Sequence, residues 1–116
     1  MKEKLIELLM TFGLPVYLQG SMSEDEEYPS SFFTFYNFEK KEGGFYSGRP
    51  TTINWGFWVY IYADDPEEVE TKLDEAAVLL RKNGWVIENK GEDVASDEPS
   101  HTGRMMTCRF LEFMEE

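Results

Sequence analysis

The apolar residues near the start of the chain recur with the spacing of a helix. Gaps of three, one and three residues place four large side chains on one side of a helix: Leu5, Leu8, Leu9 and Phe12. Gly13 supplies a C-terminal stop, and Pro15 prevents the helix from resuming. We therefore expect a short amphipathic helix over residues 2–12, followed by a brief extended segment at residues 16–18.

Two later blocks are dense in aromatic and β-branched residues, which favour strands. Residues 31–38 read SFFTFYNF and residues 55–62 read WGFWVYIY. They are preceded by a polar, acidic loop at residues 21–30. The segment between them, residues 39–53, is rich in glycine, so it is expected to be a long turn or flap. The pattern predicts that the two blocks pair as an antiparallel hairpin.

The strongest local signal is the start of a second helix. Asp65 can cap it, Pro66 suits the first turn, and Glu68 can reach back to the cap. The Asn83-Gly84 pair closes the helix. One apolar stripe follows its length: Val69, Leu73, Ala76, Ala77 and Leu80.

The rest of the chain predicts two more strands, at residues 85–87 and 104–113, around a polar, acidic loop at residues 88–103. The resulting order is helix, strand, strand, strand, helix, strand, strand. Because nothing resembles a linker, residues 1–116 form one domain. We expect an α+β fold: an antiparallel (mixed) sheet of four to five strands with two helices packed on one face.

Alternate residues of a strand point to opposite faces, and here both faces are apolar. Residues 31–38 and 55–62 contain no charged side chain, whereas a sheet with one solvated face should alternate. Two short helices cover only one face. The segment 39–53 could cover the other, or another subunit could do so, and we favour the subunit. The candidate interface residues are Tyr36, Phe38, Trp58, Tyr60 and Tyr62, with Phe45 and Tyr46 from the 39–53 segment.

Composition narrows the classes of partner. Aromatic residues make up 16% of the chain, which is consistent with an interface as well as a core. The formal charge of −12 argues against binding to nucleic acid phosphates or to anionic membranes. The single Cys108 cannot form an internal disulfide, and Glu7 interrupts any signal-peptide core. A cytoplasmic protein without a membrane span is expected.

Candidate chemistry is sparse. His101, the one histidine, lies near acids that could suggest a metal site, yet their spacing matches no metal motif. Cys108 alternates with apolar neighbours, so we expect a small buried residue rather than a nucleophile paired with His101. The Gly-rich segment 43–50 lacks the features of a phosphate loop. We expect no catalytic, cofactor-binding or metal-binding residues, and hence no enzyme and no cofactor. The acids considered for the metal site are Glu92, Asp93, Asp97 and Glu98.

Three segments carry a family resemblance: PVYLQGSMSEDEEYPSSFFTFYNFE, WGFWVYIYADDPEEV and GEDVASDEPSHTGRMMT. They resemble a small protein found among the tail and neck genes of prophages in low-GC Gram-positive bacteria. The order of elements is similar to the tail terminator and head–tail joining proteins of long-tailed phages, which are α+β subunits that assemble as rings, commonly hexameric. The resemblance implies a virion assembly role in the tail or neck, with the protein in the host cytoplasm during assembly.

Two other classes stay open. An acidic binding module, such as a DNA mimic or an inhibitor of a host nuclease, would use the negative charge directly. Such a mimic should spread carboxylates along exposed helix and strand faces, whereas many acids here fall in expected loops. An enzyme is disfavoured because no nucleophile–base or metal constellation can be found.

Overall fold

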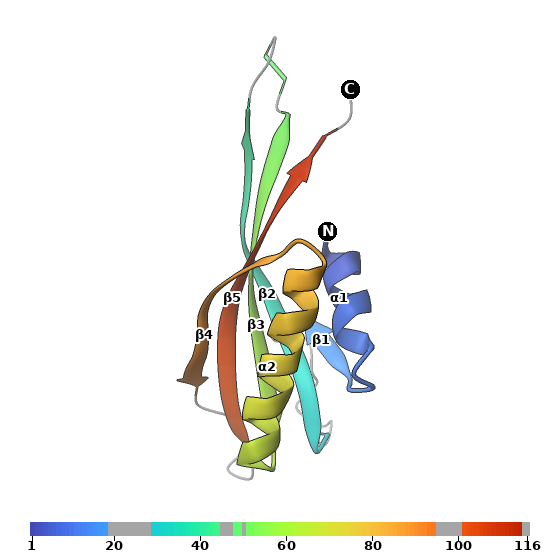
Figure 1. Cartoon of the computed structure of the whole chain (residues 1–116), viewed down its shortest axis with the longest axis vertical. Helices are drawn as coiled ribbons and strands as arrows, with labels where there is room; N and C mark the ends of the chain where they lie inside the picture. The colour runs from blue at the N-terminus through green and yellow to red at the C-terminus, as the bar shows by residue number, and fades with distance from the viewer. Residues whose placement is uncertain (19–28, 45–47, 50, 95–100, 115–116) are drawn as a thin grey trace.

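In the computed structural model, the described residues are 1–18, 29–44, 48–49, 51–94 and 101–114. They form two helices and a five-stranded mixed sheet, which confirms the expected α+β class (Figure 1). The elements in chain order are α1 (Lys2–Met10), β1 (Val16–Leu18), β2 (Ser31–Gly43), β3 (Thr52–Ala63), α2 (Pro66–Lys82), β4 (Val86–Val94) and β5 (Thr102–Phe113).

The strands lie in the order β1-β2-β3-β5-β4. The expected antiparallel hairpin of β2 and β3 is present, with Thr34 opposite Tyr60. The last strand, β5, inserts between β3 and β4 and is antiparallel to both. The short β1 pairs in parallel with β2, which makes the sheet mixed.

Both helices lie on one face of the sheet, in front of it in Figure 1. On α2 the Asp65 carboxylate accepts a bond of 3.0 Å from the backbone N–H of Glu67, so the expected cap is present. The buried side chains from the two helices are Leu5, Leu9, Val69, Leu73, Ala76, Ala77 and Leu80, and those from the sheet include Phe33, Phe35, Phe57, Val59, Ile61, Met106 and Cys108. This arrangement leaves the opposite face of the sheet without a described helix.

The long turn or flap expected over residues 39–53 is shorter than predicted, because residues 39–43 and 52–53 belong to strands. Strand β2 continues to Gly43 and β3 begins at Thr52, and this hairpin projects beyond the helices (Figure 1). A bulge at Phe38 breaks the register, because Asn37 pairs with Phe57 and Glu39 with Gly56. We call residues 39–44, 48–49 and 51–55 the arm. Its glycines suggested a turn that begins at residue 39, but the charged residues before Gly43 are compatible with a strand that is solvated on both faces.

The acidic loop expected over residues 88–103 is also shorter than the sequence suggested. Strand β4 runs to Val94 and β5 starts at Thr102, with a register shift between Glu88 and Glu92. Because β4 is an edge strand, charged residues there keep it from pairing with other chains, and this gives it the composition of a loop. Residues 95–100 lie outside the described part of the chain.

Candidate functional site

The sheet face opposite the helices, which we call the open face, brings together five of the predicted interface residues. They are Tyr36, Phe38, Trp58, Tyr60 and Tyr62, and we call them the aromatic patch. Tyr36 is 46% exposed and the other four are half-buried. Within the described ranges, no helix or strand lies over this patch. The other two predicted residues, Phe45 and Tyr46, lie outside those ranges.

The rings of the patch pack on one another. Trp58 stacks on Tyr36 at 5.7 Å and on Phe38 at 4.8 Å between ring centroids, with interplanar angles of 21° and 18°. Tyr60 and Tyr62 lie nearly parallel at 6.2 Å, and Tyr62 also stacks on the buried Phe32 at 5.4 Å. These contacts explain why the rings are half-buried although no described helix or strand covers them. Desolvation by this packing raises the pKa of the Tyr60 hydroxyl.

Two glycines allow the aromatic rings to lie close against the sheet. A Cβ on Gly56 would stand 2.7 Å from Cζ of Phe38, and one on Gly103 would stand 2.7 Å from Cε1 of Tyr62. Each ring therefore occupies the space that a side chain on the neighbouring strand would fill. This covering of a glycine by a cross-strand aromatic ring is a known way to stabilise sheets.

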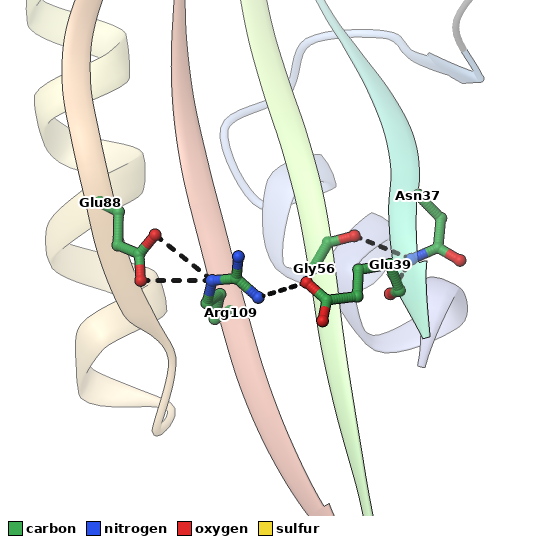
Figure 2. A network of polar contacts seen from close by, with 5 residues as sticks. All are labelled: Asn37, Glu39, Gly56, Glu88 and Arg109. Atoms are coloured by element: carbon green, nitrogen blue, oxygen red, sulfur yellow. Dashed lines mark hydrogen bonds and ion pairs between the residues drawn. The ribbon is translucent and has the colours of Figure 1, made fainter. Parts of the chain in front are cut away.

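A polar cluster borders the patch where the arm begins (Figure 2). Arg109 of β5 pairs with Glu39 of β2 at 2.7 Å and with Glu88 of β4 at 3.2 Å. Its guanidinium also lies 5.3 Å from the ring centroid of Phe38. The hydrogen bond to Glu39, followed by that to Glu88, raises the pKa of Arg109. One cation and two carboxylates leave this cluster with a formal charge of −1.

The Asn37 side chain holds the bulge that brings Glu39 into this cluster. Its Nδ2 donates to the carbonyl oxygens of Gly56 at 2.8 Å and of Glu39 at 2.9 Å (Figure 2). Phe38 and Glu39 together oppose Gly56, so the ring and the carboxylate both reach the open face. Sequence reasoning missed the cluster, because its three charged residues come from three strands and meet only through the register.

Sequence reasoning also missed three exposed apolar residues on the same face. Leu111 and Phe113 follow Arg109 at alternate positions of β5, and Val86 is paired with Arg109. They are 49%, 74% and 58% exposed. The alternation of the last strand was the signal that could have revealed Leu111 and Phe113. They extend the apolar surface of the open face toward the arm.

The residues considered for chemistry do not meet. Cys108 is fully buried on the helix face, and desolvation raises the pKa of its thiol to about 12. His101 lies toward the open face, against the Phe32 ring, with Nε2 2.7 Å from the carbonyl oxygen of Pro29. His101 precedes the first residue of β5, whereas Cys108 lies seven residues further along the chain in the core, so the two do not form a pair. Across the described ranges, no group of three or more potential ligands is placed to hold a metal ion.

A hollow of about 560 Å³ lies between the start of α2 and the β4–β5 hairpin. Arg104 in its wall pairs with Glu70 at 3.3 Å and with Asp93 at 3.0 Å. Asp93 was one of the acids considered for a metal site, and here its carboxylate forms an ion pair with Arg104 instead. Asp97 and Glu98 lie outside the described residues, as does the side chain of Glu92.

No family model matches this chain, and a search of curated proteins finds no relative. None of the helices in the described part of the chain is long and apolar enough to cross a membrane. The open face is therefore the feature on which a functional interpretation rests.

Proposed function

We propose that this protein is a structural subunit of a bacteriophage or prophage tail or neck, a tail terminator or head–tail joining protein that acts through ring oligomerisation. The resemblance of three sequence segments supports the class of protein. The aromatic patch is the observation that supports assembly, since no described helix or strand covers Tyr36, Trp58 and Tyr60. The partners are further copies, with six per ring implied by the resemblance, and other tail or neck proteins.

The chemistry of the patch suits a protein–protein contact. Tyr and Trp are enriched at interfaces because they bury a large apolar area while their polar tips still find hydrogen bonds. The strand segments that carry the patch contain no charged residue, so their burial against a partner would desolvate no unpaired charge. At the edge of the patch, Arg109 is already paired within the same chain.

The net charge is consistent with this role. A ring of subunits that each carry −12 would repel DNA phosphates passing through its channel. The proposal places the protein in the host cytoplasm during assembly and then in the virion, without direct contact to nucleic acid or membrane.

The first test measures assembly in solution. The mass of the wild type is compared with that of the double variant Trp58→Ala/Tyr60→Ala by light scattering and native mass spectrometry. Val78→Ala is the matched control, because Val78 is 49% exposed on α2, on the helix side of the sheet. We expect the patch variant to lose the oligomer while keeping its circular dichroism spectrum, and the control to behave as wild type. If the patch variant unfolds instead, the patch belongs to the core.

The second test addresses the phage role itself. Deleting the gene from the lysogen that carries it should yield induced particles with tails of irregular length or with unjoined heads and tails. Electron microscopy would show this, and the Val78→Ala gene should restore normal particles whereas the patch variant should not. Normal virions from the deleted strain would refute the phage assignment.

An acidic binding module is the second candidate, and one feature of α2 favours it. Three acids, Glu67, Glu70 and Asp74, lie three and four residues apart along its exposed side. A regular row of carboxylates on a helix is what a mimic of DNA phosphates requires. Competition with DNA for a basic nuclease would support this function, and its loss in a Glu67→Gln/Asp74→Asn variant would locate it on α2.

A further inference from the structure

The arm has a charge that differs from the rest of the chain. Residues 39–52 contain three cations and two acids, a net charge of +1. The whole chain carries −12, so the residues outside this segment carry −13. Lys41 and Arg49 are exposed, and their side chains form no hydrogen bond, ion pair or ring contact with another described residue. The arm also projects beyond the helices, and β5 pairs with its β3 strand there, where Trp55 Nε1 donates to Glu112 at 3.1 Å (Figure 1). The arm's own residues are therefore slightly cationic on an acidic molecule, and Glu112 of the neighbouring β5 lies beside them.

The open face has the complementary chemistry. Cations are attracted to the π-faces of aromatic rings such as those of the aromatic patch. The cluster of Glu39, Arg109 and Glu88 beside the patch carries −1 and is partly exposed. Two open faces packed against each other would bring together two clusters of the same negative sign. A cationic segment is the better cover for this face.

The lengths of the two features agree. The β2 part of the arm, Glu39–Gly43, has five residues, and the patch runs along β3 from Trp58 to Tyr62, also five residues. At about 3.3 Å per residue each spans about 16 Å. An arm laid along the open face of another copy would reach from one end of the patch to the other.

We propose that the arm of one copy lies on the open face of the next copy, with Lys41 and Arg49 near the aromatic patch and the Glu39–Arg109–Glu88 cluster. This inference rests on the proposed function and names the two surfaces that meet. The contact is heterologous, because each copy offers its arm to one neighbour and its open face to another. Contacts of this type close into rings when the rotation between copies allows it.

Charge reversal on the arm tests the contact. Lys41→Glu/Arg49→Glu changes the formal charge from −12 to −16, and Lys2→Glu/Lys4→Glu on the exposed start of α1 makes the same change elsewhere. We expect the arm variant to raise the dissociation constant for self-association at least about tenfold, because two cation contacts are lost. The α1 control should stay close to wild type. Salt raised from about 0.05 M to about 0.5 M should weaken wild-type association as well.

Mixing variants tests the direction of the contact. The arm variant keeps an intact open face, and Trp58→Ala/Tyr60→Ala keeps an intact arm. Each alone should stay monomeric, whereas their mixture should form heterodimers of one copy each, seen by native mass spectrometry. An isologous contact between open faces predicts no such rescue.

The failures of the two proposals can be told apart. If the arm variant assembles as well as the α1 control while the patch variant does not, the arm is not the occupant of the open face, and the proposed function stands. Equal loss in the arm variant and the α1 control would reveal an effect of net charge and would overturn the arm contact. A wild type that stays monomeric at all concentrations and salts overturns the arm contact, whereas normal virions without the gene overturn the proposed function.

Discussion

The ring of Phe38 lies directly over Gly56, so close that a Cβ on this glycine would be 2.7 Å from the ring's Cζ. The same ring lies between Trp58 at 4.8 Å and the guanidinium of Arg109 at 5.3 Å. A single glycine thus lets one aromatic side chain connect the aromatic patch to the polar cluster at the base of the arm.

Gly56→Ala should destabilise the fold by about 1–3 kcal/mol, because the new methyl group displaces the Phe38 ring from both neighbours. The matched control is Gly43→Ala in the same hairpin, where a Cβ would stand 3.4 Å from Oγ1 of Thr52. Urea unfolding of the two variants measures the difference. Equal stability of the two would show that Phe38 moves away at no cost.

Removing the Arg109 cation should leave Glu39 and Glu88 without their shared partner. We expect Arg109→Met to lower the free energy of unfolding by about 1 kcal/mol, a modest value because all three groups are partly solvated. Adding Glu39→Gln should restore part of this loss, since one of the two unpaired carboxylates is then neutral. A double-mutant cycle measures this coupling, and strictly additive effects would contradict the ion pair.

Leu73→Asp should unfold the domain. Leu73 is 1% exposed in the core between α2 and the sheet, so the variant would bury an unpaired carboxylate. Val78→Asp, five residues further along the same helix, is the control, because Val78 is 49% exposed. Circular dichroism and thermal melts should show an unfolded first variant and a folded second one. A folded Leu73→Asp protein would mean that the α2 stripe is not the core.

The buried thiol of Cys108 predicts how stability depends on alkaline pH. Desolvation raises its pKa from 9.0 to about 12, so the folded protein holds this proton more tightly than the unfolded chain. The protonated thiol therefore contributes to the free energy of unfolding. This contribution is complete below pH 9 and is lost between pH 9 and about 12, at about 1.4 kcal/mol per pH unit.

Cys108→Ala is less stable overall because of the cavity it leaves, but this part of the pH slope should vanish. Urea unfolding at several pH values compares the slopes of the two proteins. The pKa of Tyr60 is also raised, so its ionisation lowers stability at alkaline pH in both proteins. Because the effect is the same in the wild type and in Cys108→Ala, it cancels in the comparison. Identical slopes would show that the thiol ionises without unfolding.

The sequence predicted best where short-range chemistry decides the structure. The cap at Asp65, the apolar stripe through Leu73 and the pairing of the two aromatic strands were all predicted and are present. It also predicted which face of these strands meets the helices, because the alternation of side chains fixes Phe57 and Trp58 on opposite sides.

It predicted poorly where strands carry charge. Residues 39–53 were expected to be a turn and residues 88–103 a loop, yet strands occupy 39–43 and 88–94, since a solvated edge or projecting strand has the composition of a loop. The Arg109 cluster depends on residues 39, 88 and 109 meeting, and nothing local in the sequence relates them.

By itself, then, the sequence determined the two helices, the pairing of the aromatic strands and the aromatic character of both their faces, because these follow from spacing along one chain. The tertiary structure decided that β5 inserts between β3 and β4, in a sheet whose helices cover one face as predicted. That choice leaves Trp58 and Tyr60 on the open face and brings Arg109 within reach of Glu39. Register and strand order are set by contacts between distant segments, which only the folded chain brings together.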